Sequence, residues 1–433
     1  MARHRQHSPL NVFLNGRLVG QLRRGPSGAI SFQYDPGWLA WAHTMPVSLS
    51  LPLREDAYTG APVRAVFENL LPDNDELRRR IAARTHADGT DAWSLLRAIG
   101  HDCVGALQFL EPDRDPGPAG AIDGEPVSTK GIAEMLANLA RNPLGISENE
   151  DFRISIAGAQ EKTALLRWKD AWLKPRGTTA TTHIFKPSIG RLPNGLDLTH
   201  SVENEFLCLR LLESLDLPAA KARMSHFGGR SVLIVERFDR LWTEDGRLLR
   251  LPQEDFCQAL SIPPALKYES DGGPGPEAIL RLLRDSDTPA EDQRSFLKAL
   301  VVFWLLGATD GHAKNFSIFL YPGGRYRMAP LYDVISAQPS VDAGEVRQNA
   351  FRLAMAVGNS RHYRINTIAP RHFLQTARRA GVGEEIVNSI FGELSDTGEK
   401  AMARTIHQLP ARFPKEVARS IRAGFIRRLK LLG

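Results

Sequence analysis

The chain has 433 residues, of which 42% are hydrophobic and 24% are charged. This length and composition predict a globular protein of roughly two to four domains and exclude a disordered or fibrous chain. The longest wholly apolar run, residues 299–306, is far shorter than the ~20 residues needed to cross a bilayer, so we expect a cytoplasmic protein that does not enter a membrane.

The net charge of +6 is concentrated at the two ends of the chain. Residues 1–24 contain five arginines and no acidic residue, and residues 401–433 contain eight basic residues and one glutamate. Such ends could bind nucleic acid or an acidic partner. Solvated helix faces are often as basic without any anionic ligand, and the sequence leaves both interpretations open.

Residues 1–110 are predicted to form a small α+β unit. Two alternating apolar arms in residues 10–22 flank Asn15 and Gly16, a pair that favours a tight hairpin turn. Pro, Gly and Asp are concentrated in residues 111–127, which predicts a linker. Hydrophobic periodicity predicts further strands at residues 30–34 and 47–51 and helices at residues 73–84 and 92–100.

The rest of the chain is predicted to form two lobes. Residues 128–250 contain short β-prone runs and one amphipathic helix, which predicts a sheet with a helix laid on it. Residues 251–433 lose the β alternation and predict an all-helical lobe. The individual predictions are strands at 154–156, 163–166, 183–185 and 232–235 and helices at 203–215, 296–306 and 414–432.

Polar residues follow the apolar helix that is predicted to end at Gly307. Asp310 and Asn315 have the spacing Asp-x-x-x-x-Asn, in which a carboxylate orients an acceptor hydroxyl and the amide oxygen binds Mg²⁺ during phosphoryl transfer. Asp333 follows a predicted turn at residues 323–324 and a short strand, and offers a second hard oxygen ligand. These side chains also cap turns by bonding the backbone, so each alone is a weak signal.

Lys186 lies at the end of a predicted apolar strand, where its ammonium group could bind phosphate. Glu205, in the first turns of the next predicted helix, could supply the carboxylate that holds this lysine. The alternatives are a solvated lysine and an acidic residue that only complements the helix dipole.

Two further segments could contact a nucleotide. Ala157, Gly158, Ala159 and Gln160 form a small-residue turn whose backbone N–H groups can approach phosphates, although an ordinary hairpin is the alternative. Residues 235–240, with Glu236 and Phe238, fit a connector between lobes that offers backbone groups to adenine, although a charged strand end is the alternative and is favoured when this segment is taken alone.

These signals occur in the order of a kinase domain: glycine loop, lysine, helical glutamate, connector, Asp-x-x-x-x-Asn and a final aspartate. Together they predict an α+β, two-lobed protein-kinase-like fold with a β-rich N-terminal part and an all-helical C-terminal lobe. They also predict phosphoryl transfer that uses ATP and Mg²⁺.

Five stretches of the chain are informative together: Phe67-Glu-Asn-Leu-Leu-Pro-Asp73, Ser155-Ile-Ala-Gly-Ala-Gln-Glu-Lys-Thr163, Arg250-Leu-Pro-Gln-Glu-Asp255, Lys267-Tyr-Glu-Ser-Asp-Gly-Gly-Pro-Gly275 and Ala308-Thr-Asp-Gly-His-Ala-Lys-Asn-Phe316. They closely resemble the HipA family of bacterial toxin kinases, and the resemblance extends over the full length of the chain. The stretch in the N-terminal unit resembles an extra subdomain of that family.

The resemblance implies a role for each site residue. Asp310 would be the catalytic aspartate, Asn315 and Asp333 would bind Mg²⁺, and Ser155 would be a serine that the kinase phosphorylates on itself. A phosphate at Ser155 would repel the nucleotide and silence the enzyme. Lys186 would contact the ATP phosphates, and Glu236 and Phe238 would offer backbone groups to adenine. Together with the residues that the sequence motifs suggest, the predicted ATP-binding set is Ala157, Gly158, Ala159, Gln160, Lys186, Glu205, Glu236, Phe238 and His312.

The resemblance also implies partners that the residues themselves do not identify. These are a small HipB-like helix-turn-helix antitoxin, operator DNA bound together with it, and glutamyl-tRNA synthetase as the phosphorylated protein. Two other functions remain open: a small-molecule kinase on the same fold, and a catalytically silent DNA corepressor. The complete set of Asp310, Asn315 and Asp333 argues against the silent form, because a module kept only for binding needs no metal ligands.

Overall fold

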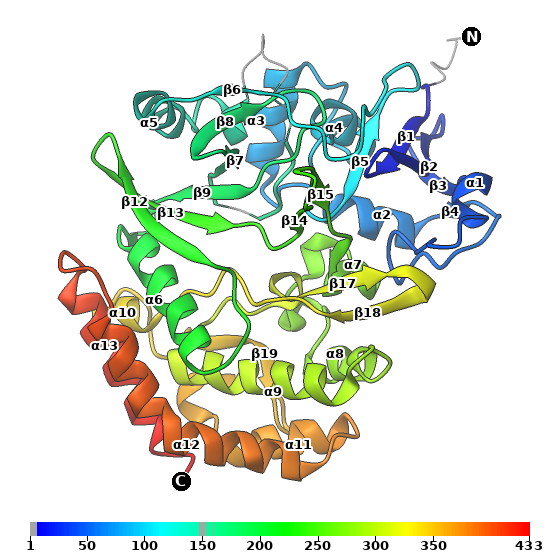
Figure 1. Cartoon of the computed structure of the whole chain (residues 1–433). Coiled ribbons are helices and arrows are strands. Elements are labelled where there is room, and N and C mark those ends of the chain that lie inside the picture. The colour runs from blue at the N-terminus through cyan, green and yellow to red at the C-terminus, as the bar shows by residue number, and fades with distance from the viewer. Residues whose placement is uncertain (1–6, 147–151, 153, 159) are drawn as a thin grey trace.

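The computed structural model describes residues 7–146, 152, 154–158 and 160–433. An N-terminal α+β unit and a strand-rich lobe lie on one side of the molecule, and a larger, mainly helical lobe lies on the other (Figure 1). The predicted α+β fold class and two-lobed arrangement are confirmed. No helix in the described part of the chain is both long and apolar enough to span a membrane.

The N-terminal unit is a five-stranded antiparallel sheet in the order β4-β3-β2-β1-β5. The predicted hairpin is confirmed, because Asn15 and Gly16 adopt the positive φ angles of 47° and 79° that its turn requires. The predicted helices are confirmed within two residues of their ends. The elements are β1 (Leu10–Leu14), β2 (Arg17–Arg24), β3 (Ile30–Tyr34), α1 (Pro36–Leu39), β4 (Tyr58–Thr59), α2 (Ala61–Glu68), α3 (Asp75–Thr85), α4 (Ala92–Ile99) and β5 (Leu107–Leu110).

The strand predicted at residues 47–51 is wrong, because this segment forms a turn. The Ser48 hydroxyl accepts a hydrogen bond from the Ser50 amide at 3.2 Å, and the Ser48 carbonyl accepts one from the Leu51 amide at 3.0 Å. Serine side chains that bond nearby backbone groups compete with strand pairing in this way. The Leu49 amide instead donates to the carboxyl group of Glu254, in the helical lobe, at 2.8 Å.

The strand-rich lobe has a six-stranded antiparallel sheet in the order β12-β13-β9-β7-β8-β6. Its edge strand β6 lies inside the predicted linker, so residues 124–126 belong to the sheet. Residues 154–156 form no strand, and that prediction is wrong. The strands are β6 (Gly124–Pro126), β7 (Thr163–Trp168), β8 (Ala171–Pro175), β9 (His183–Pro187), β12 (Ala222–Phe227) and β13 (Arg230–Glu236), with the small ribbons β10 (Gly190–Arg191) with β11 (Asp197–Leu198) and β14 (Arg240–Trp242) with β15 (Leu248–Arg250).

In the described part of this lobe two helices accompany the sheet, whereas the sequence predicts one. The predicted helix is α6 (Ser201–Ser214). The additional helix is α5 (Thr129–Ala137), whose first turn is capped by the Ser128 hydroxyl and whose Ile132 and Leu136 pack against the sheet core. A serine cap before an apolar i, i+4 pair is a helix-start signal, so this short helix could have been found in the sequence.

The sequence predicts an all-helical C-terminal lobe. The lobe is mainly helical but also contains strands, so this prediction is only partly correct. A three-stranded sheet in the order β16-β17-β18 lies in it, and β19 pairs with β20. These strands have three to six residues. The short strand predicted between residues 323–324 and Asp333 is β18, whereas the other strands are too short to outweigh the surrounding helical periodicity. The elements are β16 (Gln253–Asp255), α7 (Phe256–Ala259), α8 (Pro276–Leu283), α9 (Pro289–Leu306), β17 (Ser317–Tyr321), β18 (Arg325–Met328), α10 (Gln338–Asp342), β19 (Arg352–Val357), β20 (His362–Arg364), α11 (Pro370–Arg379), α12 (Glu384–His407) and α13 (Lys415–Leu429).

The buried helix α9 supports the candidate site. It ends, as predicted, at Gly307, which takes the left-handed conformation with φ of 68°. The C-terminal helix α13 packs against α9, and its Ile421 and Phe425 are fully buried, as the predicted apolar stripe requires. The buried Arg428 guanidinium also donates twice to the Leu305 carbonyl, at 3.0 and 2.8 Å. The loop after Gly307 therefore starts from a rigid support.

Candidate active site

A cavity of about 720 Å³ lies between the strand-rich lobe, the helical lobe and the N-terminal unit. All the predicted nucleotide, metal and catalytic residues that the structure describes line this cavity, whereas Ala159 lies outside the described residues. Segments far apart in the sequence are thereby brought to one place. The predicted residues that line it are Ala157, Gly158, Gln160, Lys186, Glu205, Glu236, Phe238, Asp310, His312, Asn315 and Asp333.

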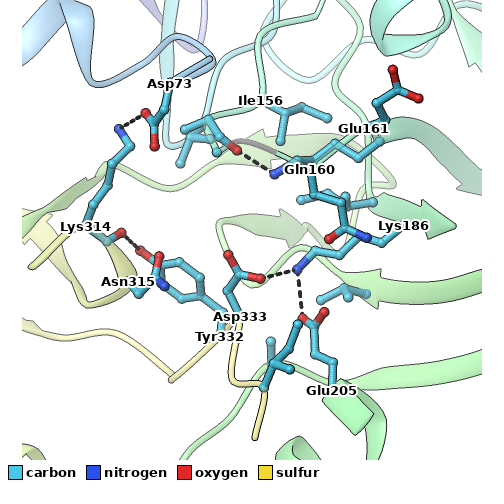
Figure 2. A pocket seen from close by; sticks show the side chains of 18 of the residues that line it. Asp73, Ile156, Gln160, Glu161, Lys186, Glu205, Lys314, Asn315, Tyr332 and Asp333 are labelled. Atoms are coloured by element: carbon cyan, nitrogen blue, oxygen red, sulfur yellow. Dashed lines mark hydrogen bonds and ion pairs between the residues drawn. The ribbon is translucent and has the colours of Figure 1, made fainter. Parts of the chain in front are cut away.

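Lys186 lies at the centre of this site (Figure 2). Strand β9 carries the side chain into the cavity, where its ammonium nitrogen lies 2.7 Å from Glu205 Oε1 and 2.9 Å from Asp333 Oδ1. Burial alone would lower the pKa of Lys186, but the Asp333 and Glu205 carboxylates raise it above its ordinary value. The predicted pairing of Lys186 with Glu205 is therefore present, and Asp333 joins it.

Asp333 is held in an unusual backbone conformation. Its φ of 60° lies in the left-handed region, which a residue other than glycine adopts at a cost and mostly where the surrounding structure fixes it. Burial acts to raise the pKa of Asp333, but the Lys186 and Lys162 ammonium groups overcome this and hold the pKa below its ordinary value. Its carboxylate is therefore ionised and available as a ligand.

Asn315 and Asp333 fit a magnesium site that is completed by phosphate and water. The Asn315 amide nitrogen donates to the Asp310 carbonyl at 2.7 Å, so its amide oxygen remains for a cation. Mg²⁺ commonly takes one or two protein oxygens and fills its other positions with water and phosphate oxygens. The described residues contain no cluster of three or more His, Cys, Asp or Glu side chains that could hold a metal ion.

Asp310 lies in the loop after α9, at the cavity wall. Its Oδ1 accepts a hydrogen bond of 2.5 Å from the Tyr268 hydroxyl and lies 3.7 Å from His312 Nε2. The Tyr268 and His312 rings meet edge to face with centroids 4.8 Å apart. Burial lowers the pKa of His312 to about 4, with a further contribution from Lys267, so that its imidazole is neutral at pH 7.

The glycine loop approaches the same cavity from the strand-rich lobe. Gly158 has a φ of 105°, and the Lys162 ammonium donates back to the Ala157 carbonyl at 2.6 Å. Gln160 is tied to the Pro187 carbonyl at 2.9 Å. Burial, together with the Lys186 charge, lowers the pKa of Lys162 to about 8. The prediction that this loop joins two strands is wrong, because residues 154–156 before it form no strand, and β7 begins after it.

Ser155 is fully buried just before this loop. Its hydroxyl donates to the Leu70 carbonyl of the N-terminal unit at 2.7 Å, and its amide donates to the Asp102 carbonyl at 2.9 Å. In this conformation the hydroxyl does not face the cavity.

The predicted connector follows β13 and provides an aromatic wall. The Phe238 ring lies 5.7 Å from Tyr332 and 5.8 Å from Phe319, centroid to centroid. Between Glu236 and Phe238, the buried Arg237 pairs with Asp239 at 2.7 Å, and both of these residues also line the cavity. This ion pair fixes the connector, which lines the cavity with Glu236 and Phe238.

For several residues that line the cavity, no function could be predicted from the sequence. Lys267, Tyr268 and Lys314 lie within motifs that carry the family resemblance, but their partners are distant in sequence. The same holds for Asn69 and Asp73, which reach the cavity from the N-terminal unit. The clustering of these residues in motif segments was the only available signal.

A strand-rich lobe with a lysine–glutamate pair, facing a helical lobe with Asp-x-x-x-x-Asn and a later aspartate, defines a protein-kinase-like fold. Two family models match the chain: the HipA N-terminal domain over residues 10–110 and the HipA-like C-terminal domain over residues 154–402. The chain belongs to the HipA family.

Individual relatives agree with this assignment. The chain is 36% identical over 402 residues to a Sinorhizobium fredii protein named "Putative kinase Y4mE", which covers 92% of this chain and 91% of that protein. It is 27% identical over 418 residues to the serine/threonine-protein kinase toxin HipA of Shewanella oneidensis, covering 93% and 90% of the two chains. A solved Shewanella oneidensis structure of HipA with HipB and operator DNA has the same fold, with a TM-score of 0.80 over 98% of each chain at 24% identity.

Proposed function

We propose that this protein is an ATP- and Mg²⁺-dependent serine/threonine protein kinase that acts as the toxin of a toxin–antitoxin module. The observation that carries the proposal is the Lys186 ammonium group, which pairs with both Glu205 and Asp333 in a cavity that also contains Asp310 and Asn315. The similarity to two proteins that are named as kinases supports the proposal.

Different residues of the cavity would have different roles in phosphoryl transfer. Asp310 would orient the acceptor hydroxyl and accept its proton, and Lys186 would contact the phosphates of ATP. Asn315 and Asp333 would hold Mg²⁺, which when bound offsets charge on the phosphate oxygens. The glycine loop, with Gly158, Ala159 and Gln160, and the neutral His312 would lie along the phosphates, while Glu236 and Phe238 would offer backbone groups to adenine.

Ser155 is proposed as a site of autophosphorylation. Its buried hydroxyl lies 2.7 Å from the Leu70 carbonyl, a space that cannot accept a phosphate, so the modified segment would have to leave this position. A phosphate carries about −1.5 to −2 charges and would also repel the triphosphate. Mass spectrometry after incubation with Mg-ATP should find phosphate on Ser155, and the modified protein should bind ATP weakly. An unmodified Ser155, or a modified protein with normal ATP affinity, would refute this part of the proposal.

The proposed partners are a HipB-like helix-turn-helix antitoxin, operator DNA bound through that complex, and glutamyl-tRNA synthetase as the phosphorylated protein. The Shewanella assembly of HipA, HipB and operator DNA, on the same fold, supports the first two. With such partners the protein would act in the cytoplasm.

Incubation of the purified protein with labelled ATP, Mg²⁺ and a bacterial lysate tests the proposed function. The expected result is label in one or a few protein bands, including one at the mass of glutamyl-tRNA synthetase. Label that appears only in small molecules would instead identify a small-molecule kinase. The absence of any transfer would leave the silent DNA corepressor as the better interpretation.

A further inference from the structure

The N-terminal unit reaches into the active site through residues 69–73, here called the bridging segment, which connects α2 to α3. Asn69 and Asp73 of this segment line the cavity, and Figure 2 shows the Asp73 side chain facing Lys314 across its edge. The Asp73 side chain is 11% exposed. A residue from outside the two lobes therefore belongs to the wall of the site.

The bridging segment binds the loop that carries Asp310 and Asn315. The Lys314 ammonium donates to the Asn69 carbonyl at 2.6 Å and to Asn69 Oδ1 at 2.9 Å, and it lies 3.6 Å from Asp73 Oδ1. The Lys314 carbonyl in turn accepts a hydrogen bond of 2.9 Å from Tyr332. Lys314 directly precedes Asn315 in the sequence, and Tyr332 directly precedes Asp333. Each proposed metal ligand is therefore the direct neighbour of a residue that takes part in these contacts.

Asp73 also holds the segment that contacts the catalytic aspartate. Its Oδ2 lies 2.9 Å from the Lys267 ammonium. The Lys267 carbonyl accepts the Ala313 amide at 3.4 Å, and the next residue, Tyr268, donates to Asp310. The Asp73 carboxylate thus pairs with two lysines. Lys267 precedes Asp310 in the sequence, and Lys314 follows it.

The glycine loop contacts the same bridging segment from the opposite lobe. Pro72 and Gly158 form an isolated parallel bridge, and the Asp73 amide donates to the Gly158 carbonyl at 3.4 Å. The Ser155 hydroxyl donates to the Leu70 carbonyl. The bridging segment is therefore in contact with the glycine loop, the loop after α9 and the segment that begins at Lys267.

We propose that Asp73 is a positioning residue for phosphoryl transfer: by pairing with Lys267 and Lys314 it holds Asp310 and Asn315 in their working arrangement. This inference rests on the proposed kinase function and adds that the N-terminal unit is part of the catalytic site. Asp73 acts through the two lysines and the backbone, and not on the reacting atoms themselves.

A second set of contacts already attaches the N-terminal unit to the strand-rich lobe, so Asp73 is not needed as a tether. The buried Asp102 carboxylate lies 2.8 Å from Arg240, 3.0 Å from Arg250 and 3.3 Å from Arg237. Loss of the Asp73 charge should therefore leave the unit docked and change only the geometry near the cavity.

The test compares Asp73→Asn with Asp88→Asn. Both aspartates belong to the N-terminal unit and both pair with a cation, but the partner of Asp88 is the surface residue Arg97, at 3.0 Å. We expect Asp73→Asn to lower kcat by roughly 10- to 100-fold with little change in KM for ATP, because small misplacements of catalytic groups have effects of this order. Amide hydrogen exchange of residues 310–316 should accelerate in Asp73→Asn and not in Asp88→Asn.

Lys267→Met tests the same contact from its other side, and the double variant with Asp73→Asn should lose less activity than the product of the two single effects. Unchanged exchange of residues 310–316 in Asp73→Asn, or a full kcat in an active enzyme, would overturn the inference. If the wild-type protein transfers no phosphate, the proposed function fails, whereas the exchange measurement still decides whether Asp73 positions the loop.

Discussion

The Tyr268 hydroxyl donates a hydrogen bond of 2.5 Å to Oδ1 of Asp310, across 42 residues of sequence. One oxygen of the proposed catalytic carboxylate is thereby fixed, which leaves the other for the acceptor hydroxyl. Burial raises the pKa of Asp310, and this hydrogen bond acts in the opposite direction.

Tyr268→Phe should therefore raise the pKa of Asp310 further and leave the carboxylate less well oriented. We expect the acid side of the pH–rate profile for kcat/KM to move to higher pH, with a loss in rate of about tenfold at its plateau. Tyr363→Phe, which removes a hydroxyl from a tyrosine outside the cavity lining, is the control. A profile for Tyr268→Phe that coincides with the wild-type profile would show that the hydrogen bond has no part in catalysis.

Asp333→Ala should abolish the part of ATP binding that depends on Mg²⁺. The substitution removes a proposed metal ligand and one of the two carboxylates that neutralise Lys186. Isothermal calorimetry with and without Mg²⁺ measures this effect, and Asp285→Ala, at an exposed position, provides the control. An ATP affinity that depends on Mg²⁺ as strongly in Asp333→Ala as in the wild type would refute the assignment.

Glu254 should make stability depend on pH. Burial raises its pKa from 4.5 to about 8, so the folded protein retains a proton that the unfolded chain releases. Its stabilising contribution is complete below pH 4.5 and is lost as the pH rises through 8. Because Glu254→Gln cannot ionise, we expect the free energy of unfolding of the wild type, relative to this variant, to fall between pH 5 and 8.

Denaturant unfolding at several pH values measures this difference. Glu399→Gln, at an exposed position, should follow the wild-type curve. A constant difference between the wild type and Glu254→Gln over the range would mean that Glu254 does not hold its proton in the folded state.

Helix α13 should contribute strongly to the stability of the helical lobe. Phe425 is fully buried, so Phe425→Ala should lower the free energy of unfolding by ~3–5 kcal/mol. Leu431 is 55% exposed, and Leu431→Ala should have almost no effect. Equal stabilities of the two variants in denaturant would show that the helix serves only contacts with partners.

Much of the fold and part of the site could be predicted because local patterns determine them. The hairpin at Asn15 and Gly16 follows from turn chemistry, and α9 with its end at Gly307 follows from a continuous apolar helix and a left-handed cap. Lys186 and Glu205 could be paired because a strand end and the first turns of the following helix are close neighbours in this fold.

The other features of the site depend on contacts between segments that are distant in sequence. Hydrophobic periodicity does not indicate such contacts. Asp73 and Lys314 are 241 positions apart, and the charge pattern around each is that of an ordinary surface residue. Strand β17 was missed because it is short and is paired with strands that are equally short. Residues 47–51 were mistaken for a strand because their serines alternate with apolar residues, although these serines bond nearby backbone groups.

The central claim is that Asp310 carries phosphoryl transfer, and Asp310→Asn tests it most directly. Asn315 binds the Asp310 backbone carbonyl, and the new amide oxygen can still accept from Tyr268, so the fold should be retained. Transfer of labelled phosphate from ATP to protein, measured beside the melting temperature and the ATP affinity, should fall by ~10² or more while the other two stay unchanged. Near-normal transfer by the variant would contradict the account.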